Sequence, residues 1–180
     1  VKSYEINNSS SFSDFEKKLK EKAEVFFHQI DVNFMDCNSN IEVVKRKKAS
    51  DYLNFYTANH PNGITNISMY NSIQYKNVYN GIDVDFYGND NGFEYDFVIA
   101  KNADPSQIKL FWKGSEGMEI TQKGNLRIKT SLHDIVESIP EAYQIINGKK
   151  ILVKVTYKLF KVPHSDNSIV SFKIGNYNAD

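Results

Sequence analysis

Four carboxylates that lie close together in the sequence are the residues best placed to do chemistry. They are Asp83, Asp85, Glu94 and Asp96. Asp83 and Asp85 alternate with apolar residues, and so do Glu94 and Asp96, so two adjacent strands would put all four side chains on one outward face. Carboxylate oxygens are the ligands that hard cations prefer. The four residues are therefore the candidate face for a cation or a polar ligand, with no role assigned to any one of them.

The spacing of these carboxylates can be compared with that of two known sites, the calcium-binding EF-hand loop and the carboxylate pair of a glycoside hydrolase. Asp83, Asp85, Gly88 and Glu94 fall at positions one, three, six and twelve of an EF-hand loop, but Tyr87 occupies position five and the flanking segments alternate like strands. An EF-hand is therefore not expected. Asp83 and Asp85 would be separated by roughly 7 Å along a strand, which lies within the range that glycoside hydrolysis needs. A glycoside hydrolase-like enzyme is accordingly the third interpretation of function.

The other potentially reactive side chains carry no recognisable motif. Cys37 is the single cysteine and cannot form an internal disulfide, and we interpret it as a small residue at a strand end. His28 falls on the apolar side of an alternating segment, where a packed, hydrogen-bonded histidine is more common than a metal ligand or a general base. The sequence contains no glycine-rich phosphate loop, nucleophile elbow, paired-cysteine site or His-Glu-x-x-His pattern. We predict no catalytic residue, no metal ligand, no cofactor and no enzyme.

The composition narrows the range of partners. Lys plus Arg and Asp plus Glu both number 22 among 180 residues, which argues against nucleic acid as a partner, because phosphate binding needs excess positive charge. Apolar runs stay well below bilayer-spanning length, so no membrane insertion is expected. The chain begins with Val and shows no signal peptide, which we interpret as a fragment of a larger protein or a mature segment, with any targeting signal outside it.

Period-two alternation predicts an all-β, mainly antiparallel fold. It is found around residues 25–35, 108–113, 126–129, 151–159 and 170–174, and Trp112 falls on a predicted core stripe. Further strands are expected at 41–44 and 52–56, separated by an exposed hairpin tip at Lys45-Arg46-Lys47-Lys48. Four Asn-Gly pairs, at 62, 80, 91 and 147, predict tight turns. A short helix over about residues 14–23 is expected from a capping box at Ser13. The fold class is a β-sandwich-like single domain over residues 1–180, with residues 1–12 as a flexible lead.

The register of the acidic hairpin can be predicted from charge and turn chemistry. A turn at Asp90-Asn91 sets Asp85 opposite Asp96, whereas a turn at Asn91-Gly92 sets Asp85 opposite Val98. Like charges directly opposite each other are unfavourable, and Asn-Gly is the better turn. Both considerations favour the second register.

Several motifs in a fixed order resemble one family. They are Leu53-Asn54-Phe55-Tyr56, Tyr75-Lys76-Asn77-Val78-Tyr79-Asn80-Gly81-Ile82-Asp83, Phe86-Tyr87-Gly88-Asn89, Phe93-Glu94-Tyr95-Asp96-Phe97-Val98-Ile99, Ala103-Asp104-Pro105-Ser106-Gln107-Ile108, Pro140-Glu141-Ala142-Tyr143-Gln144 and Gly175-Asn176-Tyr177-Asn178. Residues 52–178 resemble the N-terminal domain of secreted bacterial surface proteins that carry seven-bladed β-propeller (SBBP) repeats. Asn80 stands where that family usually has proline, and residues 1–50 match poorly. The resemblance implies an extracellular or cell-surface β domain of poorly defined function beside repeat modules, and it transfers no catalytic residue.

The leading hypothesis is a non-catalytic structural or interaction domain of a secreted or cell-surface protein, serving assembly, adhesion or display. Its expected partners are other domains of the same polypeptide and, in second place, a surface glycan or protein. The alternative is a carbohydrate- or peptide-binding module, which the many tyrosines and the acidic face favour.

Overall fold

The computed structural model describes residues 25–90 and 92–179. The expected helix over 14–23 and the lead over 1–12 lie outside the described residues. Thirteen strands and one short 3-10 helix form within the described part. They are β1 (Asp31–Phe34), β2 (Glu42–Thr57), β3 (His60–Tyr79), β4 (Ile82–Asn89), β5 (Gly92–Ile99), η1 (Pro105–Gln107), β6 (Leu110–Lys113), β7 (Met118–Ile120), β8 (Leu126–Ile128), β9 (Ile135–Glu137), β10 (Ala142–Ile146), β11 (Lys149–Val153), β12 (Val155–Lys161) and β13 (Ser168–Ile174).

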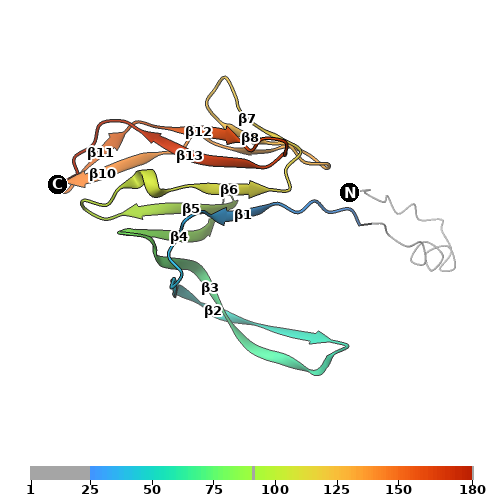
Figure 1. Cartoon of the computed structure of the whole chain (residues 1–180). Helices are drawn as coiled ribbons and strands as arrows, with labels where there is room; N and C mark the ends of the chain where they lie inside the picture. The colour runs from blue at the N-terminus through green and yellow to red at the C-terminus, as the bar shows by residue number, and fades with distance from the viewer. Residues whose placement is uncertain (1–24, 91, 180) are drawn as a thin grey trace, which may run out of the picture.

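The strands form four antiparallel sheets, which confirms the all-β class (Figure 1). The first sheet has the order β1-β6-β13-β12 and the second the order β2-β3-β4-β5, while β7-β8-β9 and the β10-β11 hairpin form two smaller sheets. The two large sheets face each other through aromatic side chains. The ring of Phe97 on β5 lies 6.3 Å from that of Phe34 on β1 and 5.9 Å from that of Phe172 on β13. This is a sandwich, as the alternation predicted.

The core contains two clusters that share the Phe34, Tyr95, Phe97 and Phe172 rings. The first cluster is Leu110, Trp112, Met118, Leu126, Ile128, Tyr157 and Val170, and the second is Val78, Tyr79, Ile82, Val84 and Ile108. Most of these residues lie on the predicted apolar stripes, and the expected core position of Trp112 is confirmed. Within residues 25–90 and 92–179, no helix is long and apolar enough to cross a membrane.

The strand predicted from Val25 begins only at Asp31. The side chains of Val25, Phe26 and Phe27 are 80%, 72% and 82% exposed, so the alternation predicted around residues 25–35 does not place Phe26 in a core. The register explains the difference: β1 pairs with β6 only from Asp31 to Phe34, and residues 25–30 have no ladder partner. Alternation alone does not make a strand where no neighbour completes its backbone hydrogen bonds.

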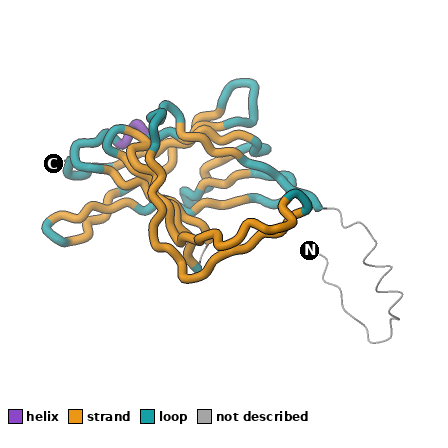
Figure 2. The backbone as a smooth tube through the Cα atoms, turned by 90° about the horizontal axis from the view of Figure 1, so that it is seen from below, coloured by secondary structure: helices purple, strands orange, loops and turns teal. Residues whose placement is uncertain are grey.

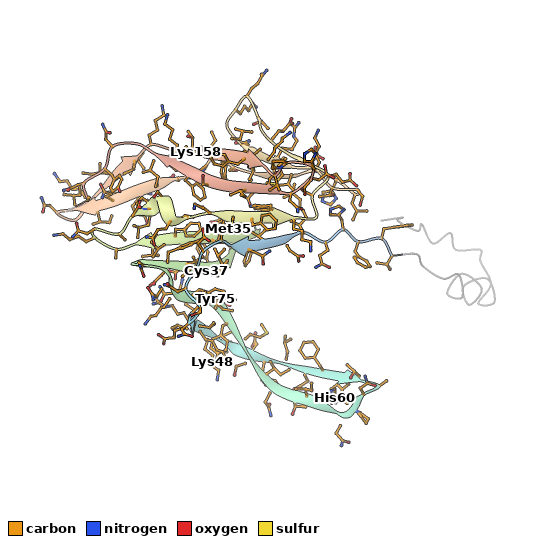
Figure 3. All side chains as sticks on the ribbon, viewed as in Figure 1. Met35, Cys37, Lys48, His60, Tyr75 and Lys158 are labelled. Carbon is orange, nitrogen blue, oxygen red and sulfur yellow. The ribbon has the colours of Figure 1, made fainter. Side chains whose placement is uncertain are left out.

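The hairpin of β2 and β3 projects from the body as a long arm (Figures 1 and 2). The predicted strands at 41–44 and 52–56 both fall in or at the start of β2, but the basic hairpin tip predicted between them is wrong. The Lys45-Arg46-Lys47-Lys48 run lies within β2, and the turn is at residues 58–59. Lys48 lies toward the base of the arm and His60 near its tip (Figure 3).

Two of the four Asn-Gly turns form as predicted. Asn80-Gly81 joins β3 to β4, and Asn147-Gly148 joins β10 to β11 with φ of 50° and 74°. The other two predictions are wrong. Asn62-Gly63 lies within β3, and Gly92 pairs with Asn89 in the β4–β5 ladder and so is not a central residue of the turn.

Candidate functional site

The four predicted acidic residues lie together on the outward side of β4 and β5. Asp83 and Asp85 come from β4, while Glu94 and Asp96 come from β5. Their neighbours at alternating positions, Val84 among them, belong to the core. The sequence therefore located this surface correctly, because a strand with one buried face must turn its charged residues to the other side.

The predicted register of this hairpin is wrong. Asp85 lies directly opposite Asp96, Tyr87 opposite Glu94 and Asn89 opposite Gly92. The observed register brings the ring of Phe86 into a stack with Phe93, at 5.9 Å and 17°. Aromatic pairs contribute about 0.5–1.5 kcal/mol, which matches or exceeds the cost of one cross-strand pair of like charges.

Asp83 has a structural role at the start of this face. Its Oδ1 accepts a hydrogen bond of 2.7 Å from the backbone N–H of Asn77. Asn77 has a φ of 55° and lies where β3 and β4 lose register between Tyr75 and Tyr79. The carboxylate thus satisfies a backbone donor that the irregular ladder leaves without a strand partner.

Asp85 and Asp96 differ in how well their oxygens are satisfied. The hydroxyl of Tyr87 donates to Oδ2 of Asp96 at 2.9 Å, and this bond raises the pKa of the Tyr87 hydroxyl because the carboxylate favours the protonated phenol. Oδ1 of Asp85 is buried and has no hydrogen-bond partner among the described residues. Across that same part of the chain, no ion pair includes any of the four acidic residues. Arg46 lies on the same side of the sheet and donates to Oε1 of Gln74, which is directly opposite Asp85.

A shallow hollow adjoins this face. It has a volume of about 460 Å³ and is lined by Lys47, Tyr70, Asn71, Tyr87 and Gly88. The ammonium of Lys45 lies 5.6 Å from the centre of the Tyr70 ring. Two phenol rings, an amide and an ammonium give the hollow both stacking surfaces and hydrogen-bonding groups.

The described residues offer no metal centre. Within residues 25–90 and 92–179 no group of three or more His, Cys, Asp or Glu side chains could hold a metal ion. A strand directs successive outward carboxylates along a flat surface, whereas Ca²⁺ needs six to eight oxygens around one point. The cation-binding interpretation of Asp83, Asp85, Glu94 and Asp96 gains no support from this geometry.

His28 and Cys37 occupy separate places. Nε2 of His28 donates to the carbonyl of Gly114 at 2.6 Å, and Nδ1 accepts from the backbone N–H of Ser131 at 3.2 Å, with Oγ of Ser131 2.8 Å away. The expectation of a hydrogen-bonded histidine is confirmed. Cys37 is half-buried against the second core cluster. Neither residue lines the hollow beside the acidic face.

A carboxylate that the sequence did not reveal lies between the sheets. The hydroxyls of Tyr95 and Tyr157 donate to Oε2 of Glu137 at 3.4 and 3.3 Å. Burial raises the pKa of Glu137, and the two hydroxyls offset part of that rise. Its partners lie 42 and 20 residues away, so no local pattern could have found it.

Fold and site together define an all-β sandwich domain with an acidic sheet face and a projecting arm. Over residues 2–180 the chain matches the family described as Domain of unknown function (DUF7948), and it belongs to that family. No curated protein and no solved structure matches the chain.

Proposed function

We propose that this chain is a non-catalytic interaction domain of a secreted or cell-surface bacterial protein, and that its β2–β3 arm docks on a neighbouring domain of the same polypeptide. The arm carries this proposal. Leu53, Phe55 and Ile64 on it are 44%, 49% and 47% exposed, although each is a side chain that proteins usually bury.

Two cross-strand pairs of the arm are apolar. Leu53 is paired with Ile67 and Phe55 with Ile64, so the four side chains form two directly opposed cross-strand pairs. Tyr52 lies on the other face, because adjacent residues of a strand point to opposite sides. The arm therefore has two exposed apolar pairs, with a ladder irregularity between Leu53 and Phe55, and they form a patch available for packing.

The arm has little support of its own. β4 pairs with β3 only from Ser72 onward, so residues 60–71 of β3 and residues 48–57 of β2 form a two-stranded ribbon. An isolated ribbon of this kind is marginally stable in water. The base of its outer edge is protected by the Lys45-Arg46-Lys47-Lys48 run and by Lys47 at a φ of 51°, features that discourage edge-to-edge aggregation. The apolar patch on the arm has no such protection, and we infer that a specific partner packs against it.

The resemblance to the N-terminal domains of SBBP-repeat surface proteins supports the choice of partner and location. In those proteins such a domain stands beside repeat modules, so a neighbouring module would be present at high effective concentration.

Hydrogen–deuterium exchange in the intact gene product tests the docking. Amides of residues 50–68 should exchange at least tenfold more slowly there than in this domain alone, which corresponds to about 1.4 kcal/mol of added local stability. Leu53→Ser with Phe55→Ser should abolish that protection, whereas Tyr52→Ser, on the opposite face, should retain it. Equal exchange rates in the domain and in the intact protein would contradict the proposal.

Cell fractionation tests the location separately. Antibody against this domain should detect it in the medium or on intact cells, and protease added to intact cells should remove it. Detection only after lysis would contradict an extracellular location and leave the docking result unaffected.

One observation favours the alternative, a carbohydrate- or peptide-binding module. The hollow beside the acidic face presents the rings of Tyr70 and Tyr87 together with the amide of Asn71. Aromatic faces with adjacent hydrogen-bonding groups suit sugar rings. A glycan array would test this: binding that is lost in Tyr87→Ala and kept in Tyr52→Ser supports it, and no binding to any glycan rejects it.

A further inference from the structure

β5 is the open edge of the second sheet. It stands last in the order β2-β3-β4-β5 and pairs with β4 along its whole length (Figure 1). Among the described residues no other strand pairs with β5, and the backbone hydrogen bonds outside the ladders include none from residues 92–99. In an antiparallel pair, every second residue directs its N–H and C=O groups away from the partner strand. The far edge of β5 therefore presents a row of backbone donors and acceptors that a further strand could pair with.

Other edge strands of the two large sheets carry protection that β5 lacks. β2 contains register shifts and the Lys45-Arg46-Lys47-Lys48 run, and β12 carries Lys158 and Lys161. Natural proteins use such irregularities and lysines to keep sheet edges from pairing. β5 contains no Lys, Arg or Pro, and its ladder with β4 runs without a shift from Gly92 to Ile99. This regular edge is accordingly open to strand addition.

The apolar side of β5 is incompletely covered. Phe93 is 74% exposed, and its ring stacks on that of Phe86 with 5.9 Å between the centroids. Ile99, at the other end of the same side, is 38% exposed. Tyr95 and Phe97 lie between them and pack against the core clusters. Apolar residues on an added strand would extend this row, because directly opposed side chains on one face of a sheet lie in contact.

The outward side of β5 selects the charge of the added strand. Glu94 and Asp96 lie on this side, and no ion pair within residues 25–90 and 92–179 includes either of them. The guanidinium of Arg46 is on β2, with β3 and β4 between it and β5, and it donates to Gln74. Asp96 also has Asp85 directly opposite on β4. A cation on the free side of Asp96 would offset that repulsion, whereas a carboxylate there would add to it.

The same charges argue against a second copy of β5 as the added strand. Two β5 strands paired edge to edge with their apolar sides together would place Glu94 and Asp96 of one copy on the same side as those of the other. Like charges directly opposite each other destabilise a ladder. The strand that fits this edge is therefore a different one, apolar at every second position and basic at the positions between.

We propose that the far edge of β5 takes up an extended segment of another polypeptide, in which apolar residues alternate with Lys or Arg. The added strand pairs with the free backbone groups, sets its apolar side chains beside Phe93 and sets its cations beside Glu94 and Asp96. In such strand addition the main-chain hydrogen bonds supply affinity and the alternating side chains supply specificity. The interaction goes beyond the proposed docking of the arm, because it uses the opposite edge of the second sheet.

A synthetic peptide provides the first test. Acetyl-Thr-Val-Lys-Val-Lys-Val-Thr-amide, paired antiparallel with β5, sets its lysines opposite Glu94 and Asp96 and its valines opposite the residues between. Calorimetric titration of the 180-residue chain at low salt should show binding at least about tenfold tighter than for the same peptide with Glu at both Lys positions. The lysine peptide should also slow amide exchange within residues 92–99 and leave β12 unchanged. A chain that binds both peptides equally, or neither, would overturn the proposal.

Backbone methylation distinguishes strand pairing from simple charge attraction. In an antiparallel pair only every second residue of the peptide donates its N–H to β5. One version of the lysine peptide is therefore methylated on the backbone nitrogens of its valines, and another on those of its lysines, with every side chain kept. One version should lose binding and the other should keep it. Equal affinities of the two versions would reject strand addition.

Variants of the chain give the third test. Glu94→Gln with Asp96→Asn should weaken binding of the lysine peptide at least about fivefold, because both cross-strand ion pairs are lost. Asp51→Asn with Glu116→Gln is the matched control, since it makes the same change of charge at exposed positions outside β5. Equal weakening by the two double variants would show that net charge, and not the edge of β5, attracts the peptide.

The arm variant separates this interaction from the docking of the arm. Leu53→Ser with Phe55→Ser should keep peptide binding, because it leaves β5 intact. Peptide binding that this variant abolishes would assign the site to the arm and reject the edge of β5. Failure of arm protection in the intact gene product, with peptide binding preserved, would instead reject only the arm docking.

Discussion

The ring of Tyr56 covers Gly63 across the β2–β3 arm. A Cβ added at Gly63 would lie 2.5 Å from Cε1 of Tyr56, and Gly63 has a φ of 77°. The sequence marked this glycine as a turn residue, but it serves a bend within β3 that lets an aromatic ring close over the backbone. A position with a positive φ and no room for a side chain favours glycine on both counts.

Gly63→Ala should therefore loosen the arm without unfolding the body. The left-handed conformation costs an L-residue about 1–2 kcal/mol, and the added methyl group displaces the Tyr56 ring. Exchange of amides in residues 52–68 should accelerate at least about fivefold, while amides of β12 and β13 should be unaffected. Gly148→Ala is the matched control, because Gly148 has a φ of 74° with nothing within 4 Å of the added Cβ. Unchanged exchange in the arm would show that Tyr56 does not hold it.

Asp85→Asn should stabilise the protein. It removes one of two like charges that lie directly opposite each other and reduces the cost of burying an unsatisfied carboxylate oxygen. We expect a gain of about 0.2–1 kcal/mol in the free energy of unfolding by urea. Asp83→Ala should have the opposite sign, a loss of about 1.5–3 kcal/mol, because its carboxylate accepts the Asn77 N–H. Equal effects at the two positions would contradict the distinction between them.

The sequence predicted the sandwich well where one face of a strand is buried. Leu110, Trp112, Tyr157 and Val170 are buried as their alternation indicated. Burial of one face fixes which residues point inward, since a shift by one position would expose every apolar side chain. The same rule located the acidic face on β4 and β5.

Prediction from the sequence failed where contacts with distant parts of the chain decide which face is buried or which register forms. The arm exposes both of its faces, so alternation in residues 50–62 carries no information about a core. In the β4–β5 hairpin, the two possible registers kept the same faces, and the choice depended on contacts such as Phe86 with Phe93. Tyr95 reaching Glu137 is another contact that no local pattern encodes.

His28→Ala should weaken the attachment of residues 25–30 to the body. The imidazole connects this segment to the carbonyl of Gly114 and to the N–H of Ser131. Loss of these bonds should cost about 1–2 kcal/mol in urea unfolding. Ser131→Ala should cost less, because its backbone N–H remains available to Nδ1. A larger loss for Ser131→Ala than for His28→Ala would show that the hydroxyl, not the imidazole, is the main link.

Glu137 should make stability depend on pH in the acidic to neutral range. Its pKa in the folded protein is raised above the ordinary value of 4.5, mainly by burial. The unfolded chain therefore releases this proton first, so the group contributes its full stability below about pH 4.5, and that contribution is lost as pH rises through the folded pKa. Urea unfolding of the wild type across this window should show the decline.

Glu137→Gln should remove this part of the pH dependence. Glutamine stays neutral at every pH, and its carbonyl can still accept from the hydroxyls of Tyr95 and Tyr157. The unfolding free energy of the variant relative to wild type should therefore increase as pH rises from about 4 to 7. Tyr157→Phe should shift the decline to higher pH, since the hydroxyl that it removes lowers the pKa of Glu137. If wild type and Glu137→Gln show the same dependence of unfolding free energy on pH, the pKa of Glu137 does not differ between the folded and the unfolded protein, and the argument from burial fails.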